Sequence, residues 1–225
     1  MVIEEPDARR AINLDDAYSV KTPDDNRKLY ARWAATYESE FVDKELYRYP
    51  RAVAGVFHNQ IGREAVACVV DVGTGTGLTG TYLTSHRPEL VIDGIDISPE
   101  MLAQAIVKSR RDHSPVYRQL FERDLTQEVL FTNAPYDALI CSGTFTHGHL
   151  GPDAIENLLP LVRPEGWLVI GVNNEHFLAQ DFESEIVSYV DRGLITMPKV
   201  ERIDVYEEGS PHRGDQARVL IFSRS

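Results

Sequence analysis

Short apolar runs alternate with amphipathic stretches over most of the chain beyond about residue 65. The runs are rich in valine, isoleucine and leucine and end at glycine, proline or acidic residues, a pattern typical of buried strands in a parallel sheet. They predict five strands, at residues 67–72, 90–95, 116–120, 138–141 and 167–172. Cap and periodicity signals predict three helices between them. The first begins after Gly77, the second runs from Ser98 to about residue 111, and the third covers residues 153–162. Such alternation predicts βαβ units, and therefore an α/β fold with helices on both faces of the sheet.

The last third of the chain departs from this alternation. A helix predicted over residues 176–192 is followed by two strands, 200–206 and 217–222, with only a polar loop between them. A link this short joins antiparallel neighbours and is too short for a parallel crossover. We therefore expect a Rossmann-like, doubly wound sheet of seven strands, mostly parallel, with one antiparallel strand near the edge. No repeat or linker divides the sequence, which predicts a single domain over residues 1–225.

The first 45 residues carry no strand pattern. Residues 1–21 are polar and without periodicity, which predicts a flexible arm. Thr22 suits the N-cap of a helix and Pro23 suits its first position. Aromatic side chains then recur at three- and four-residue spacing, at Tyr30, Trp33, Tyr37 and Phe41. This stripe predicts a helix over residues 22–45 that acts as a lid, although ordinary core packing would explain the same stripe.

Charge and composition narrow the possible partners. The 225 residues include 23 lysines and arginines against 35 acidic residues, for a formal net charge of −12. Such a chain repels phosphate backbones and anionic membranes, so we expect neither nucleic acid nor membrane as a partner. Cys68 and Cys141 lie in apolar runs without metal-ligand spacing, which predicts buried thiols, a reducing compartment and no metal. The acidic N-terminus has no apolar signal segment. We expect a cytoplasmic protein, either a monomer or a homodimer.

A glycine-rich loop follows the first predicted strand. Residues 69–77 read VVDVGTGTG, and the loop opens a helix. Glycine lets a backbone approach a ligand closely, and this position lies at the edge of a doubly wound sheet where ligands bind. Asp96 ends the second strand, where its carboxylate can accept hydrogen bonds from both hydroxyls of a ribose. Together they predict a nucleoside cofactor.

The residues alone leave two nucleoside cofactors open. Residues 75–80 match the G-x-G-x-x-G pattern of dinucleotide sites, which would suit an NAD-dependent dehydrogenase. Asp71, however, brings a negative charge near the loop, which is unfavourable for a pyrophosphate. The same charge favours a cationic ligand such as S-adenosylmethionine.

Four segments resemble the signatures of class I S-adenosylmethionine-dependent methyltransferases. Residues 69–77 are similar to the first signature and residues 94–102 to the second, while residues 136–143 and 161–167 resemble the fourth strand and the turn into the fifth. The resemblance extends from about residue 28 to the end. Residues 30–38 and 142–149 are similar to the small single-domain enzymes of the Williams–Beuren-region type. Glu165 departs from the pattern, because the family usually has glycine there.

The resemblance implies S-adenosylmethionine as the cofactor and assigns contacts for its methionine and ribose. Asp71 would lie near the cofactor's amino group, and the carbonyl of Ser142 would face the same ammonium. Asp96 would hold the ribose hydroxyls. The loop residues beneath these groups would be Gly73, Thr74 and Gly75.

The resemblance also assigns the adenine contacts and a cover. Ile97 and Met101 would flank the adenine, and Asp124 would accept from its amino group beside the backbone of Leu125. Core packing is an alternative for Met101, and a helix cap is one for Asp124. The aromatic residues that would close over the cofactor are Trp33 and Tyr37.

The implied chemistry is in-line transfer of a methyl group from a sulfonium to a nucleophile, in which the enzyme mainly aligns the reactants and excludes water. His147 and His149 follow the fourth strand at the edge that carries the glycines, which makes them candidate catalytic residues, His147 first. The segment after that strand lacks the Asn/Asp-Pro-Pro-Tyr/Phe motif of DNA-adenine and glutamine methyltransferases. We therefore expect a small-molecule acceptor. The sequence does not indicate whether its methylated atom is oxygen, nitrogen, sulfur or carbon. A cofactor-binding protein of this fold that transfers no methyl group is the main alternative.

Overall fold

The computed structural model describes residues 12, 14–61, 66–127 and 135–225. These residues form one seven-stranded sheet in the order β3-β2-β1-β4-β5-β7-β6. The strands are β1 Cys68–Val72, β2 Val91–Asp96, β3 Tyr117–Glu122, β4 Tyr136–Phe145, β5 Val162–Asn173, β6 Lys199–Asp204 and β7 Gln216–Ser223. The first five are parallel, whereas β7 is antiparallel to both β5 and β6. The predicted fold class, including one antiparallel strand next to the edge, is confirmed.

The central strand β1 is buried on both faces. Its residue Val69 lies opposite Ile92 of β2 and Ala138 of β4, and all three are completely buried. Because side chains alternate along a strand, Val69 joins the core on one face while Val70 joins the core on the other. The continuous apolar run of β1 follows from this two-sided burial.

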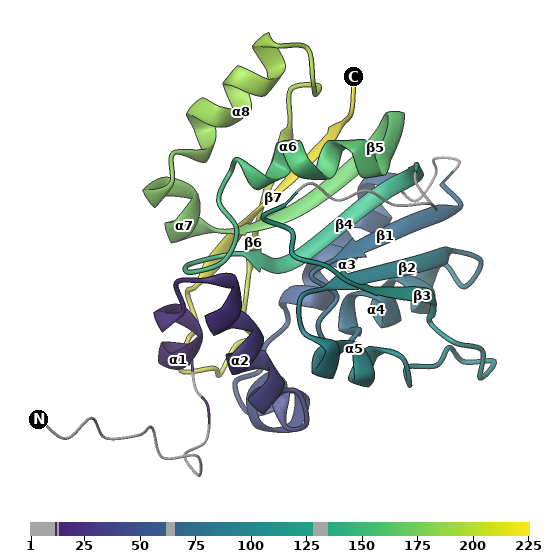
Figure 1. Ribbon diagram of the computed structural model, residues 1–225, viewed down its shortest axis with the longest axis vertical. Helices are drawn as coiled ribbons and strands as arrows, with labels where there is room; N and C mark the ends of the chain where they lie inside the picture. Colours follow the sequence, from purple (N-terminus) through teal and green to yellow (C-terminus); the bar gives the residue numbers. More distant parts are fainter. Residues whose placement is uncertain (1–11, 13, 62–65, 128–134) are drawn as a thin grey trace, which may run out of the picture.

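Helices cover the two faces of the sheet separately (Figure 1). One face packs against α3 (Tyr49–Ile61), α4 (Leu78–His86) and α5 (Pro99–Ala105), and the other against α6 (Ala154–Leu158), α7 (Asn174–Ala179) and α8 (Phe182–Asp191). The sequence analysis missed α3, whose residues carry no strong cap signal. None of the helices in the described ranges is both long enough and apolar enough to cross a bilayer.

Several predicted helices are shorter in the structure. The helix expected from Ser98 to about residue 111 ends at Ala105, and the helix expected over residues 153–162 is α6 followed by the 3₁₀ turn η2 (Leu159–Leu161). The helix expected over residues 176–192 divides into α7 and α8. The break falls at Asp181, whose φ of 49° lies in the left-handed region and cannot continue a right-handed helix.

The N-terminal segment is also more structured than expected. The irregular arm predicted for residues 1–21 is wrong at residues 14–19, which form helix α1 (Leu14–Ser19), while residues 1–11 and 13 lie outside the described residues. Burial of Ala17 and Val20 in the core accounts for this order. The single helix predicted over residues 22–45 is instead α2 (Pro23–Trp33) followed by a π-helical segment η1 (Tyr37–Val42).

The start of α2 follows the predicted pattern. The Thr22 side chain accepts from the backbone N–H of Asp25, and the Asp25 carboxylate accepts from the backbone N–H of Thr22, which makes a full capping box. The cap holds α2 in place beyond the carboxyl ends of the strands, beside α1 (Figure 1).

Candidate functional site

A cavity of about 290 Å³ lies at the carboxyl ends of β1, β2 and β4, beneath α1 and α2. Its floor is the glycine-rich loop after β1. Asp96 and Ile97 at the end of β2 form one side, and the start of the loop after β4 forms another. This is the sheet edge at which the sequence analysis expected a ligand.

Glycine is required at positions 73 and 75 of the loop for different structural reasons. Gly73 has a φ of 71°, and a Cβ on it would lie 1.7 Å from Oγ1 of Thr144, so this glycine permits close packing of the loop against β4. Gly75 has a φ of 54°, and no atom of the described protein lies within 4 Å of the position its Cβ would take. Both line the cavity with Thr74. Protein packing therefore accounts for Gly73, whereas Gly75 leaves room on the cavity side.

Asp96 ties the glycine loop to the next turn. Its Oδ2 accepts from the backbone N–H of Gly75 at 2.7 Å, and its Oδ1 accepts from that of Ser98 at 2.9 Å. Burial raises the pKa of the Asp96 carboxyl, and the two N–H bonds act in the opposite direction. Ser98 in turn caps α5 by accepting from the N–H of Met101 at 3.2 Å, as the sequence predicted.

Asp71 does not line the cavity, although the resemblance implies a position near the cofactor's amino group. The side chain is completely buried and accepts from the Tyr117 hydroxyl at 2.7 Å, and that hydroxyl accepts from the backbone N–H of Gly80 at 3.2 Å. Burial raises the pKa of Asp71 to about 7. The reason is strand alternation, which turns Asp71 toward the face that Val69 shares with Tyr117.

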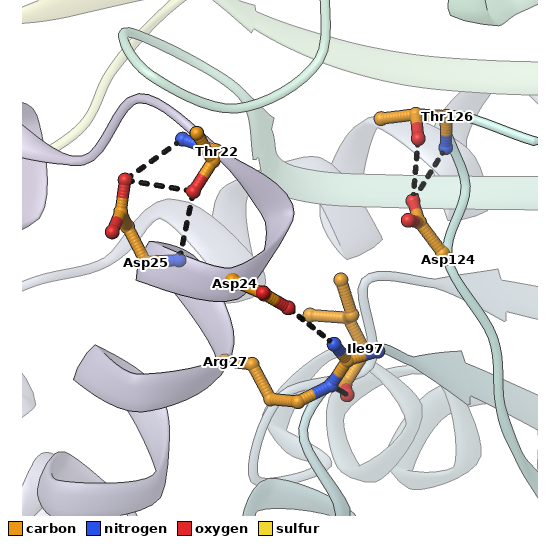
Figure 2. A network of polar contacts seen from close by, with 7 residues as sticks. All are labelled: Thr22, Asp24, Asp25, Arg27, Ile97, Asp124 and Thr126. Atoms are coloured by element: carbon orange, nitrogen blue, oxygen red, sulfur yellow. Dashed lines mark hydrogen bonds and ion pairs between the residues drawn. The ribbon is translucent and has the colours of Figure 1, made fainter.

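The residues expected around the adenine lie together on the cavity wall: Ile97, Met101, Asp124 and Leu125. Met101 is also a core residue, with 1% of its surface exposed. Asp124 Oδ1 accepts from both the backbone N–H and the hydroxyl of Thr126, at 3.0 and 2.7 Å (Figure 2). Core packing therefore coexists with a place on the wall for Met101. Asp124 caps no helix within the described residues, because residues 125–127 form a turn and a bend, and its bonds to Thr126 belong to that turn.

Aromatic side chains form the opposite part of the cavity. We call this set the aromatic wall; it comprises Tyr30, Trp33, Tyr37, Phe41, Tyr47, Tyr49 and Tyr206. The Trp33 ring lies 5.0 Å from Tyr37 and 5.1 Å from Phe41, measured between centroids. Burial raises the pKa of Tyr37 well above its usual value, so this phenol stays neutral. The rings of the predicted aromatic stripe therefore pack against one another and also line the cavity.

Three members of the aromatic wall escaped the sequence analysis. Tyr47 and Tyr49 follow η1 without helical spacing, and Tyr206 lies beyond β6. A single antiparallel bridge pairs Tyr47 with Tyr206, and their rings lie 5.5 Å apart. The bridge joins residues far apart in the sequence, and Tyr49 lies at the start of α3, so no local sequence signal marked these three as cavity residues.

Polar contacts fasten α2 across two loops of the sheet edge. Asn26 Nδ2 donates to the carbonyl of Gly148 at 3.2 Å, and Arg27 Nε donates to the carbonyl of Ile97 at 3.4 Å. Figure 2 shows Arg27 reaching down from α2 to Ile97 while Asp24 holds the guanidinium at 3.1 Å. The helix thereby spans the turn after β2 and the loop after β4.

The two candidate catalytic histidines point in different directions. His149 lines the main cavity, where its Nε2 lies 3.0 Å from the Tyr30 hydroxyl. His147 instead lines a separate, polar hollow with Asn174 and Glu175, and its ring lies 5.4 Å from that of His176. The turn at Gly148, whose Cα packs against Val20, separates the two side chains. Of the two histidines, His149 is therefore the one that lines the main cavity, whereas His147 was the first candidate from the sequence.

Buried polar atoms on the cavity wall provide a test of whether the site suits a cofactor with many polar groups. Within the described residues, no hydrogen-bond partner is present for Trp33 Nε1, Thr76 Oγ1, Ser142 Oγ or Asn26 Oδ1, and all four residues line the cavity. Buried polar groups normally have partners. Together with the room at Gly75 and the carboxylates of Asp96 and Asp124, these atoms fit a ligand that carries hydroxyls, an amino group and a heterocycle, as S-adenosylmethionine does.

Comparison with known proteins agrees with this architecture. Residues 70–168 match the family model described as a methyltransferase domain. Over 84 residues the chain is 33% identical to malonyl-[acyl-carrier protein] O-methyltransferase of Herminiimonas arsenicoxydans. That alignment covers 36% of this chain and 30% of the relative, so the match spans less than a third of the relative's length.

Solved structures of methyltransferases share this fold. An S-adenosylmethionine-dependent methyltransferase from Clostridium acetobutylicum ATCC 824 superposes with a TM-score of 0.56 and 14% identity, covering 86% of this chain and 98% of that one. The plantazolicin methyltransferase BpumL, in complex with a monoazolic desmethylPZN analog and SAH, gives a TM-score of 0.56 and 14% identity, with 90% and 96% of the two chains covered. At these identities the likeness concerns the fold.

Proposed function

We propose that this chain, whose residues 70–168 match a methyltransferase domain, transfers a methyl group from S-adenosylmethionine to a small-molecule acceptor. The observation that carries the proposal is the composition of one cavity. It joins a glycine loop held by Asp96 to a wall of aromatic rings with His149 at its edge. The glycine loop with Asp96 suits a nucleoside, and the aromatic wall with His149 suits an acceptor with an apolar body.

When bound, S-adenosylmethionine supplies a methyl group already activated on a sulfonium. The residues of this chain would then bind, align and dehydrate the reactants. Asp96 uses one lone pair of each carboxylate oxygen for Gly75 and Ser98, which leaves acceptor capacity on both oxygens for the two ribose hydroxyls. Gly73, Thr74 and Gly75 would lie beneath the ribose and methionine.

The other expected contacts follow the cavity wall. Ile97 and Met101 would flank the adenine, with Asp124 and the Leu125 backbone at its edge. Ser142 lines the cavity, and its carbonyl would face the ammonium of the cofactor's methionine part. Trp33 and Tyr37 would cover the cofactor, and their position on the aromatic wall supports this role.

Segment 22–45 would act as the lid of a single domain spanning residues 1–225. The support is that α2 lies over the cavity, where Asn26 and Arg27 fasten it to two loops of the sheet edge. Residues 23–42 should therefore exchange amide hydrogens more slowly when S-adenosylhomocysteine is added. Equal protection with and without the ligand would reduce the segment to ordinary core.

The enclosed site supports a small acceptor. Among the described residues that line the cavity, Lys21 is the sole lysine or arginine, and its side chain is exposed. An acceptor with several phosphates or carboxylates would lack partners there. The relative from Herminiimonas arsenicoxydans is named as an O-methyltransferase, which favours oxygen as the methylated atom here.

Calorimetric titration and product analysis test the proposal in sequence. The protein should bind S-adenosylhomocysteine and should not bind NAD, since residues 70–168 match a methyltransferase domain. Incubation with isotope-labelled S-adenosylmethionine and a metabolite extract should then yield a labelled small molecule, detected by mass spectrometry. Binding of NAD alone would favour the dehydrogenase alternative. Binding of S-adenosylhomocysteine without any labelled product would favour a protein that binds the cofactor and transfers no methyl group.

A further inference from the structure

A tyrosine and a histidine from distant parts of the chain meet inside the cavity. Tyr30 lies on α2, and His149 lies in the loop after β4. The Tyr30 hydroxyl is 3.0 Å from His149 Nε2, and the two rings pack edge to face with centroids 5.7 Å apart. Both residues line the cavity. The sequence analysis did not consider Tyr30 for a chemical role.

The other ring nitrogen of His149 fixes the direction of this hydrogen bond. Nδ1 lies 2.9 Å from the backbone carbonyl of His147, and because a carbonyl only accepts, Nδ1 must carry the proton. In the neutral ring Nε2 then has a lone pair, which accepts from the Tyr30 hydroxyl. Burial lowers the pKa of His149, and the neighbouring His176 lowers it further, so the ring is neutral near pH 7.

The pair depends on the position of α2. Asn26 and Tyr30 are four residues apart on one face of the helix, and both reach the loop that runs from β4 to α6: Asn26 contacts Gly148 and Tyr30 contacts His149. Arg27 anchors the same helix to Ile97. Movement of α2 away from the sheet edge would therefore separate the hydroxyl from the imidazole.

We propose that Tyr30 and His149 form the proton-accepting pair for a neutral hydroxyl acceptor, a role that rests on the proposed methyl transfer. The acceptor oxygen would form the new bond to the methyl carbon while the carbon–sulfur bond of the sulfonium breaks and leaves its electron pair on sulfur. The acceptor's proton passes to the Tyr30 oxygen as the Tyr30 proton moves to His149 Nε2. The products are a methyl ether, S-adenosylhomocysteine and an imidazolium, so atoms and charge balance.

The surroundings disfavour a carboxylate acceptor. A carboxylate has no proton to lose and would seek a cation, whereas the lining offers only the exposed Lys21 among the described residues. A hydroxyl loses its proton only as the bond forms and therefore benefits from a base. The aromatic wall beside the pair suits a planar, uncharged body, which points to a phenol-type acceptor.

The first experiment needs no natural acceptor. Protein with ¹⁵N-labelled histidine, saturated with S-adenosylhomocysteine, should show His149 with a protonated Nδ1 and an unprotonated Nε2 at pH 7 by NMR. Tyr30→Phe should shift the Nε2 resonance and leave the Nδ1 resonance nearly in place. A protonated Nε2, or a spectrum that Tyr30→Phe does not change, would overturn the assignment of the pair.

The second experiment measures single-turnover methyl transfer from labelled S-adenosylmethionine to three probes of one shape, 4-ethylphenol, 4-ethylbenzoate and 4-ethylaniline. Transfer is expected to the phenol. Tyr30→Phe and His149→Ala should each lower its rate by roughly 10²–10⁴-fold, with the affinity for S-adenosylhomocysteine within about threefold of wild type. Tyr82→Phe and His86→Ala, both on α4 and outside the cavity, are the matched controls and should keep the wild-type rate.

The outcomes separate this inference from the proposed function. If the wild-type protein does not bind S-adenosylhomocysteine, the proposed function itself is refuted. Preferred transfer to the carboxylate or the amine, or transfer to none of the three probes, would refute the hydroxyl class. Wild-type rates of methyl transfer in both Tyr30→Phe and His149→Ala would refute the proton-accepting role of the pair. The transfer would then depend only on alignment of the reactants.

Discussion

Two glycines of one loop should respond to the same substitution in different ways. Gly73→Ala and Gly75→Ala each add a single methyl group at a residue with positive φ. At Gly75 no described atom lies within 4 Å of the new Cβ, so the fold must accommodate only the strained backbone. At Gly73 the Cβ would lie 1.7 Å from Thr144 Oγ1 and 2.9 Å from Thr144 Cβ. Rotation of the threonine side chain moves Oγ1 but leaves Cβ where it is, so the backbones of β1 and β4 must separate.

The expected magnitudes differ accordingly. An alanine in the left-handed region costs roughly 1–2 kcal/mol, and in a domain of this size each kcal/mol lowers Tm by about 2–4 °C. Gly75→Ala should therefore fold, with Tm lowered by about 2–8 °C. Gly73→Ala adds a steric overlap that places it among the rare changes that cost more than about 4 kcal/mol. That is a large share of the roughly 5–15 kcal/mol that stabilises a typical protein.

Thermal unfolding and calorimetry with S-adenosylhomocysteine separate the two effects. Gly75→Ala should keep a cooperative transition and lose at least about tenfold in affinity, because its methyl group takes up space on the cavity side of the loop. Gly73→Ala should unfold at a much lower temperature or fail to accumulate as folded protein, and adding Thr144→Ala should restore part of the loss. Wild-type affinity in Gly75→Ala would refute its place beneath the ligand. Equal stability of the two variants would refute the packing argument at Gly73.

Three further changes test other parts of the structure. Asp96→Ala removes the acceptor for two backbone N–H groups, so Tm should fall and calorimetry should show at least about tenfold weaker binding of S-adenosylhomocysteine; unchanged affinity would exclude the ribose contact. Glu165→Gly relieves an exposed residue with a φ of 61° and should raise Tm by about 2–4 °C, whereas an unchanged Tm would mean that the turn is unstrained. The pKa of Asp71 is raised from 3.8 to about 7 in the folded state. Between these two pH values the folded protein therefore holds a proton that the unfolded chain has lost. The stability that this proton contributes is fully present below pH 3.8 and is lost as the pH rises through about 7. The stability of Asp71→Asn relative to wild type, from denaturant unfolding, should therefore increase between pH 5 and pH 7 by up to about 1.4 kcal/mol per pH unit, and a constant difference would contradict the raised pKa.

Local chemistry in the sequence was enough to predict the sheet and the ligand-binding edge. The order of apolar runs and helices determines a doubly wound α/β fold, because each buried strand must be followed by a helix that covers one face. The capping box of Thr22 and the Ser98 cap depend on neighbours within three residues, so both could be predicted from the sequence. The glycine loop and Asp96 were found for the same reason, since strand ends and turns carry their own residue preferences.

Side-chain direction and long-range packing were decided only by the tertiary structure. Asp71 lies at the predicted place in the chain, but strand alternation and the hydroxyl of Tyr117 turn it away from the cavity. His147 and His149 are two residues apart, and the packing of Val20 against Gly148 determines which of them faces α2. Such choices depend on atoms far away in the sequence, whose positions follow from the burial of apolar surface over the whole chain. The pattern of residues along the chain therefore determined where the cavity and its glycine loop lie, and tertiary packing decided which side chains line it.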